Sequence, residues 1–377
     1  MKILIMSDSY KGTATSVEVA RSIKKGVLRA DPSSRVRIQA MADGGEGTTE
    51  VLAEALGATY KLVSVKGPLG EIHQARIAYQ GDTWIIEMAQ ASGLHLVPWN
   101  RRNPLVTSTY GTGELLRHAL DHGAKTIYMG LGGSATNDAG AGAFVALGGK
   151  LYDRHHRYLK PGGWSLRHLK SMDSTGLHPR LDEVELIILS DVESPLCGDT
   201  GATKVFGPQK GLFKERIEDL DAALANYGRV LEQTFSCQVM DQPGSGAAGG
   251  LGATLFALFS HQVASGVETI LDLTGADELI KEADLIITGE GRLDAQSLKG
   301  KTPIGVARRA KRFHKPCIAI VGSCAFELQG IYEAGVDLVI DLSHQSSTKG
   351  YLIKHMHPLL ERAGEMAMRA AMLGRTL

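Results

Sequence analysis

The apolar and polar positions of the N-terminal region predict two strands that alternate with two helices. Residues 2–6 form an apolar run of strand length, and residues 36–41 form another. Between them, Thr15 and Glu18 form a capping-box pattern, after which apolar residues recur at helical spacing. Residues 48–56 predict a second helix. This order is typical of a parallel sheet with helices on its faces.

The C-terminal region repeats the same pattern. We predict strands at residues 285–288, 317–321 and 336–341, and helices at residues 302–314, 328–334 and 351–372. Thr302 and Pro303 provide an N-cap and an N1 proline for the first of these helices. We therefore expect both ends of the chain to build one Rossmann-like open parallel sheet.

The region between the two ends has a different pattern. It contains β-like segments at residues 60–65, 74–78 and 84–88, and glycine-rich loops between residues 130 and 252. We predict an α/β protein in which a second α/β domain is inserted in the first. The Rossmann-like domain comprises residues 1–63 and 284–377, and the inserted domain comprises residues 64–283.

One long stretch without charged residues, residues 242–267, raises the question of a membrane span. Its densest apolar part, residues 253–259, is far shorter than the roughly 20 residues that a spanning helix needs. The stretch is also rich in glycine and serine. We therefore expect a glycine-rich loop followed by a buried helix, and no membrane association.

Charge and cysteine content narrow the class of partner. The 41 basic residues balance the 41 acidic ones, so no overall field attracts nucleic acid. The four cysteines form no C-x-x-C motif and no disulfide framework. The N-terminal sequence has no signal-peptide pattern. We expect a cytoplasmic protein with small-molecule ligands, and homo-oligomerisation is left open.

Polar clusters follow the predicted strands at the point where each strand ends. The clusters are Ser7–Lys11, Asp43–Thr48, Gly132–Asp138, Ser190–Asp191, Gly289–Arg292 and Gly322–Ser323. In open α/β sheets, ligands bind beyond the carboxyl ends of the strands, so this placement predicts a shared site in the cleft between the two domains.

The residue types in these clusters indicate phosphoryl transfer. Glycine-rich segments at residues 42–50 and 132–138 could hold phosphates through backbone N–H groups, although neither matches a Walker motif. The strand ends also carry the acidic residues Asp8, Asp43, Asp191, Glu290 and Asp294, and the cations Lys11, Lys210 and Arg292. The carboxylates would repel phosphate unless a divalent cation lay between them.

Two other functions stay open on the residues alone. A dehydrogenase acting on small hydroxy acids could use a similar cleft, although no G-x-G-x-x-G motif follows the first strand. A non-catalytic metabolite sensor could share the fold. Single residues also have structural alternatives: Asp8 or Asp43 could cap a helix, Lys210 could be a solvated loop charge, and Glu290 could pair with Arg292.

Nine motifs, in order along the chain, resemble those of the type-1 family of bacterial glycerate kinases. They are SDSYKG, ADGGEGT, KGPLG, EMAQASGL, TSTYGTGEL, GLGGSATNDAGAG, FGPQKG, PGSGAAGGLGA and ITGEGRLDAQSLKGKTPIGVA. The resemblance implies ATP-dependent phosphorylation of D-glycerate with Mg²⁺, on a two-domain α/β fold. It favours 2-phosphoglycerate as the product and leaves 3-phosphoglycerate open.

For this activity, we expect a specific role for each of the strand-end residues. We expect Lys11 and Arg292 to bind the glycerate carboxylate, and Asp191 to position or deprotonate its hydroxyl group, with Asp8 and Lys11 also in the catalytic set. Expected nucleotide contacts are Gly132, Gly133, Ser134, Thr136, Asn137 and Lys210. Asp43 and Glu290 are expected to hold Mg²⁺, directly or through water.

Overall fold

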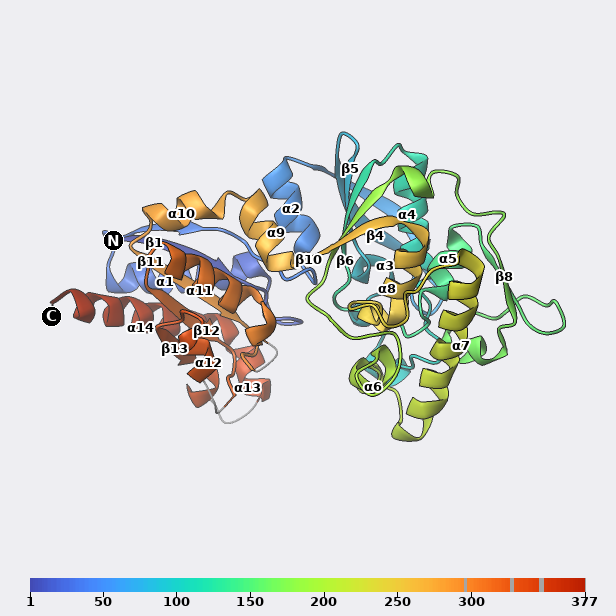
Figure 1. Ribbon diagram of the computed structural model, residues 1–377. Coiled ribbons are helices and arrows are strands. Elements are labelled where there is room, and N and C mark those ends of the chain that lie inside the picture. The colour runs from blue at the N-terminus through green and yellow to red at the C-terminus, as the bar shows by residue number, and fades with distance from the viewer. Residues whose placement is uncertain (295–296, 326–328, 346–348, 377) are drawn as a thin grey trace. The chain divides into compact units, whose positions relative to one another are not determined.

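The protein folds into two compact α/β units. The structure, a computed structural model, describes residues 1–294, 297–325, 329–345 and 349–376 (Figure 1). The first unit comprises Met1–Ala55 and Ser265–Leu377, and the second comprises Leu56–Ala264. The predicted fold class is confirmed. The units divide at residues 56 and 265 rather than at 64 and 284. The second boundary differs because α9 (Gly266–Leu273) and α10 (Ala276–Glu282) pack against α11 (Thr302–Arg312) of the first unit.

A parallel sheet of five strands forms the centre of the first unit, as predicted. Its order is β13 (Leu338–Asp341), β12 (Cys317–Val321), β11 (Leu285–Glu290), β1 (Lys2–Ser7) and β2 (Arg35–Ile38). The two chain ends meet at its middle, where Ile5 of β1 is in register with Ile287 of β11. All five carboxyl ends therefore lie at one edge of the sheet.

Except that α9 and α10 were not predicted, the described helices of the first unit follow the predicted pattern. They are α1 (Ser16–Ala30), α2 (Thr48–Leu56), α9, α10, α11 (Thr302–Arg312), α12 (Gln329–Glu333), α13 (Lys349–Lys354) and α14 (Met356–Thr376). The capping box of Thr15 and Glu18 is present, and Leu328, predicted to start a helix, lies outside the described residues. The N-cap of α11 is Lys301 rather than Thr302.

The predicted closing helix, residues 351–372, is divided at His355. Pro358 explains the break, because a proline ring clashes with the carbonyl group four residues earlier, and α13 ends at Lys354. The continuing helix α14 packs closely against α1. A Cβ atom at Gly26 would overlap the carbonyl oxygen of Glu361, so the missing side chain permits this approach.

The second unit is built on a mixed sheet of six strands. Its order is β10 (Ser260–Ala264), β9 (Glu185–Leu189), β6 (Thr126–Gly130), β5 (Thr83–Glu87), β4 (Ile72–Gln80) and β3 (Thr59–Lys66). The first four are parallel, and β4 runs antiparallel to both of its neighbours. Strands β7 (Lys150–Tyr152) and β8 (Ser171–Asp173) form a separate antiparallel pair.

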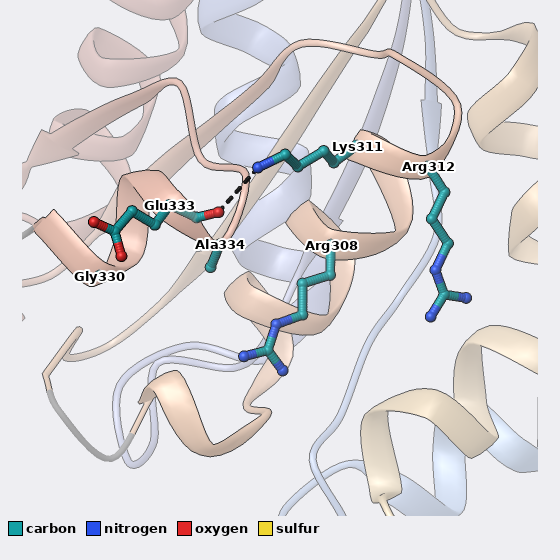
Figure 2. Close-up of a pocket in the computed structure, with 6 residues that line it drawn as sticks. All are labelled: Arg308, Lys311, Arg312, Gly330, Glu333 and Ala334. Atoms are coloured by element: carbon teal, nitrogen blue, oxygen red, sulfur yellow. Dashed lines mark hydrogen bonds between the residues drawn. The ribbon is translucent and has the colours of Figure 1, made fainter.

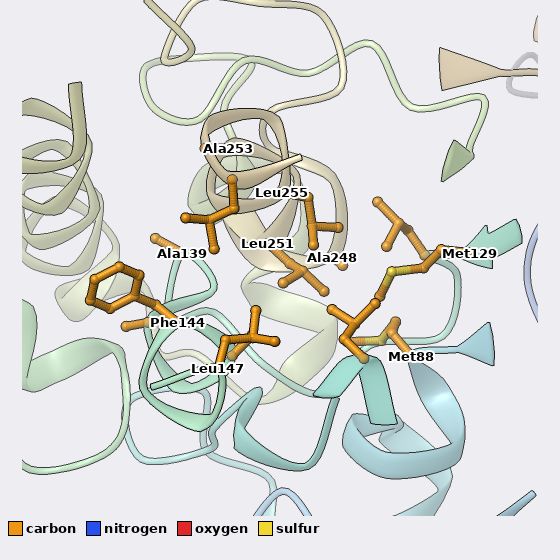
Figure 3. Packing of buried hydrophobic residues seen from close by; sticks show 14 of the residues in the cluster. Met88, Met129, Ala139, Phe144, Leu147, Ala248, Leu251, Ala253 and Leu255 are labelled. Carbon is orange, nitrogen blue, oxygen red and sulfur yellow. The ribbon is translucent and has the colours of Figure 1, made fainter. Parts of the chain in front are cut away.

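The helices of the second unit share one apolar core with this sheet. They are α3 (Ala89–Ser92), α4 (Tyr110–Asp121), α5 (Ala141–Ala146), α6 (Ala202–Phe206), α7 (Ile217–Phe235) and α8 (Ala247–Leu258). Figure 3 shows Phe144 of α5 and Leu251 of α8 in this core. The buried helix expected after the uncharged glycine-rich stretch is α8. Across the described residues, we find no helix with the length and apolar character needed to cross a bilayer.

One buried cation joins three helices of the first unit. The Arg309 side chain of α11 is 8% exposed and forms ion pairs with Glu268 and Asp272 of α9 and with Asp277 of α10. The neighbouring Arg308, Lys311 and Arg312 lie on the outward face of α11 (Figure 2) and are exposed.

We expect Arg309→Met to lower the stability of the first unit by about 2 kcal/mol, since its partners regain water but lose charged hydrogen bonds. The three tryptophans, Trp84, Trp99 and Trp164, all lie in the second unit. Urea unfolding should therefore show an earlier transition by far-UV circular dichroism and an unchanged one by tryptophan fluorescence. Arg308→Met is the matched control. Equal effects of the two variants would contradict this role of Arg309.

Candidate active site

The carboxyl ends of β1, β2 and β11 bring three acidic residues together in the first unit. Asp8 follows β1, Asp43 follows β2, and Glu290 ends β11. The backbone N–H of Asp8 donates to the carbonyl oxygen of Gly289 at 2.9 Å, which fixes two of these strand ends side by side. The sequence prediction that polar clusters of neighbouring strands meet is confirmed within this unit.

Asp8 lies deepest in this group. Its side chain accepts hydrogen bonds from the backbone N–H of Ser9 at 2.6 Å and from Oγ1 of Thr302 at 3.1 Å. Burial and the neighbouring charge of Asp43 together raise the pKa of Asp8 to about 8. Near neutral pH, Asp8 is therefore a neutral acid that can donate a hydrogen bond.

Asp43 carries the negative charge that Asp8 lacks. Burial alone would raise the pKa of Asp43, but the Lys11 ammonium, 2.9 Å from Oδ2, brings that pKa below its usual value. The Lys11 side chain is itself 56% exposed. Two adjacent carboxyl groups thus hold one proton between them, with a partly exposed cation beside the ionised one.

Glu290 has a carboxylate oxygen that is available to a ligand. Burial raises the pKa of Glu290 to about 7, against the effect of the nearby Lys301 cation. Nζ of Lys301 lies 3.7 Å from Oε2, whereas Oε1 is buried without a hydrogen-bond partner among the described residues. A buried carboxylate oxygen of this kind is suited to a metal ion, a water molecule or a donor group of a ligand.

The predicted pairing of Glu290 with Arg292 is replaced by two other pairs. Nε of Arg292 lies 3.4 Å from Oδ2 of Asp294, and its side chain is 75% exposed, which leaves the guanidinium accessible. Sequence reasoning missed Lys301 and Thr302. Their position at the start of α11, beside the strand ends, was the signal that could have identified them.

In the second unit, the loop after β6 is held by one buried carboxylate. Asp138 accepts hydrogen bonds from the backbone N–H and Oγ1 of Thr109, and from the backbone N–H groups of Gly140 and Gly142. Burial raises the pKa of Asp138 and these donors counteract it. Asp138 therefore ties the loop to the N-termini of α4 and α5.

The exposed side of the same loop offers backbone donors. Gly132 and Gly133 are accessible, and Gly133 has a positive φ of 75°. Within the described residues, the backbone N–H groups of Gly132, Gly133 and Ser134 donate to no protein acceptor. Unpaired N–H groups of consecutive small residues form the kind of concave surface that binds phosphate.

Three other predicted nucleotide contacts lie inside the protein. Thr136 and Asn137 are fully buried, and Nδ2 of Asn137 donates to Oγ1 of Thr203 at 2.9 Å. Lys210 is also buried, and its Nζ donates to the carbonyl oxygen of Thr136 at 2.7 Å. In this structure these side chains hold the loop from its inner side, and direct contact with a nucleotide stays a prediction.

A second glycine-rich segment packs against the loop. Ala248, Gly249 and Gly250 have left-handed backbone conformations at the start of α8. A Cβ atom at Gly249 would overlap the carbonyl oxygen of Thr136. The backbone N–H of Ala139 donates to the carbonyl oxygen of Gly249 at 3.0 Å. This contact with the loop explains the glycine at position 249, to which the sequence prediction assigned no role.

Asp191 lies two residues after the end of β9, in the predicted cluster with Ser190, and is partly exposed. The adjacent Ser190 is fixed by its backbone N–H, which donates to the carbonyl oxygen of Ala264 at 3.1 Å.

In the described part of the chain, we find no group of three His, Cys, Asp or Glu side chains arranged around a common metal position. A metal held here would need ligands from a substrate or water as well.

Comparison with known proteins gives this geometry a family. The model of the Glycerate kinase family matches residues 3–372. The chain belongs to the glycerate kinase family.

Relatives at substantial identity support this membership. The glycerate kinase of Halalkalibacterium halodurans is 45% identical over 363 residues, which cover 96% of each chain. The glycerate 2-kinase of Escherichia coli K12 is 45% identical over 344 residues, covering 91% of this chain and 90% of the relative. A crystal structure of a candidate glycerate kinase 2 from Salmonella typhimurium LT2 superposes with a TM-score of 0.80 and 40% identity, over 100% of both chains. The resemblance inferred from the motifs is confirmed.

We expect Asp8→Asn to stabilise the first unit, with a gain that grows from about pH 5 to about pH 8. Folded Asp8 keeps a proton to about pH 8, whereas the unfolded chain releases it above about pH 4. Wild-type stability therefore falls as pH rises through this window, and asparagine removes that contribution. Urea unfolding followed by circular dichroism at each pH measures the difference.

The exposed Asp182→Asn in the second unit is the control for this experiment, because its replacement should leave the pH dependence unchanged. An Asp8→Asn protein that follows the wild-type pH curve would show that Asp8 is ionised in the folded state.

Proposed function

We propose that this protein transfers the γ-phosphoryl group of ATP to D-glycerate, with Mg²⁺, and that 2-phosphoglycerate is the product. Membership of the glycerate kinase family over residues 3–372 carries this proposal. The name of the Escherichia coli relative, glycerate 2-kinase, favours the 2-isomer. The mixed acidic and cationic strand ends are the inventory that phosphoryl transfer requires.

The loop after β6 is assigned to the phosphates of the nucleotide. Gly132 and Gly133 have unpaired N–H groups on its accessible side, and the N–H group of the buried Ser134 is also unpaired. Thr136, Asn137 and Lys210 keep these groups in place from the buried side. Donors that are already positioned lose little entropy on binding, and they stabilise charge that develops during transfer.

Asp43 and Glu290 are assigned to Mg²⁺. They fit a magnesium ion because both carboxylates lie at strand ends, Asp43 is ionised, and Oε1 of Glu290 is a buried oxygen without a described partner. Mg²⁺ in kinases is commonly held by one or two carboxylates together with substrate phosphates and water. When bound, the ion would neutralise negative charge on the phosphates.

The remaining residues are assigned to glycerate. Lys11 and Arg292 have accessible cationic groups that can bind its carboxylate. Asp191 orients the attacking hydroxyl group and accepts its proton, whereas Asp8, whose pKa is raised by burial and by the charge of Asp43, donates a hydrogen bond to an oxygen of the substrate when it is protonated.

Phosphorus NMR of the purified protein with ATP, Mg²⁺ and D-glycerate should show a new phosphomonoester signal. The signal of 2-phosphoglycerate splits into a doublet, because one carbon-bound proton lies next to the ester oxygen, whereas 3-phosphoglycerate gives a triplet. We expect Asp191→Asn to slow its appearance by about a hundredfold or more, with an unchanged unfolding transition.

Three controls accompany this measurement. Omission of glycerate and chelation of Mg²⁺ should each prevent the signal, and Asp182→Asn should leave the rate unchanged. A wild-type protein that leaves ATP intact in the presence of glycerate would overturn the proposed reaction. Full activity of Asp191→Asn would overturn the role of Asp191 alone.

A further inference from the structure

A cavity in the second unit lies outside the residues assigned above. Its volume is about 270 Å³. Its walls come from residues 66–70, from Ser108 and Tyr110, from Ala141 and Gly142, and from residues 159–162. The first three of these segments belong to the family motifs KGPLG, TSTYGTGEL and GLGGSATNDAGAG. Motifs far apart in the sequence therefore meet at one cavity that the proposed roles leave unused.

The chemistry of the walls indicates a largely apolar ligand. Leu69, Val106, Val145 and Leu159 line the cavity, and none of its lining residues is acidic. Two cations, Lys66 and Lys160, stand at its wall, and Nζ of Lys66 lies 4.2 Å from the centre of the Tyr110 ring. An apolar cavity without carboxylates is unsuited to a metal ion, and it offers little to a molecule as polar as glycerate.

The cavity shares a wall with the loop assigned to phosphates. Oγ1 of Thr107 donates to the carbonyl oxygen of Ala135 at 2.9 Å, and the next residue, Ser108, lines the cavity. On the other side of the loop, the backbone N–H of Gly142 donates to Asp138 at 3.2 Å, and Gly142 also lines the cavity. The cavity therefore adjoins the segments that hold the loop, through Ser108 beside Thr107 and through Gly142.

From these observations we infer that the cavity holds the adenine ring of the phosphoryl donor. The inference rests on the proposed function, because it assumes that the donor is ATP. Small-molecule sites are typically roughly 300–1,000 Å³. A volume of about 270 Å³ suits a nucleobase better than a complete nucleotide, whose phosphates would lie on the adjoining loop. The apolar side chains cover the faces of the ring, and the lysines lie near the anionic end of the molecule.

Val145→Trp tests the inference, because Val145 is 38% exposed at the cavity and a larger side chain can fill the space without entering the core. The KM for ATP should rise by about tenfold or more, while kcat at saturating ATP and the KM for D-glycerate change by less than about threefold. Leu62→Trp is the control, since Leu62 is exposed on β3 and does not line the cavity. An unchanged KM for ATP in Val145→Trp would overturn the inference.

Photolabelling with 8-azido-ATP separates failure of this inference from failure of the proposed function, since labelling needs no turnover. The label should attach to peptides that contain residues 66–70, 106–110 or 159–166, and excess ADP should prevent it. Label on other peptides of a protein that phosphorylates glycerate would overturn the adenine site alone. A protein that is not phosphorylating glycerate, yet is labelled at these peptides, would overturn the proposed reaction and retain the nucleotide cavity.

Discussion

The buried carboxylate of Asp138 is the interaction on which the second unit's candidate site depends. A polar group in the protein interior is tolerated only when hydrogen-bond partners surround it, and Asp138 receives four hydrogen bonds from three residues in two segments of the chain. Thr109 acts on both sides, because its Oγ1 donates to Asp138 and accepts from the backbone N–H of Ala143 at 3.0 Å. The helices α4 and α5 and the loop after β6 are thereby fixed to one another. The backbone N–H groups of Gly132, Gly133 and Ser134 take no part in these contacts and remain for a ligand.

The candidate site of the first unit differs in where its carboxyl groups lie and in what compensates their charge. Here the carboxylates lie at the edge of a sheet, each beside a cation or a second carboxyl group, and the pKa values of Asp8 and Asp43 move in opposite directions. Neighbouring carboxyl groups with separated pKa values are a common arrangement at sites that bind and transfer charged groups. Lys11 and Lys301 compensate part of the negative charge, and a bound cation would compensate more, which is the physical reason for expecting a metal ion at these strand ends.

The sequence was sufficient for the five strands and most helices of the first unit, for the buried helix α8 and for the polar clusters at the strand ends, because each depends on local periodicity and on short motifs. The helices α3 to α7, α9 and α10 were not predicted. The sequence was also not sufficient to predict contacts between residues that are far apart in it. The pairing of Lys301 with Glu290 and the hydrogen bond from Thr302 to Asp8 depend on how α11 packs beside β1, and the burial of Lys210 depends on a contact with Thr136, far away in the sequence. The break before α14 could have been predicted from Pro358.

We propose that the loop anchored by Asp138 presents the backbone N–H groups of Gly132, Gly133 and Ser134 to phosphate. Amide hydrogen exchange across residues 130–142 tests it most directly, with and without ADP and Mg²⁺. We predict slow exchange at Ala139, Gly140 and Gly142 in the free protein, since these N–H groups are already bonded. Gly132, Gly133 and Ser134 should exchange quickly in the free protein and slowly with ADP bound. Bound ADP that leaves the exchange of these three groups unchanged would contradict the account.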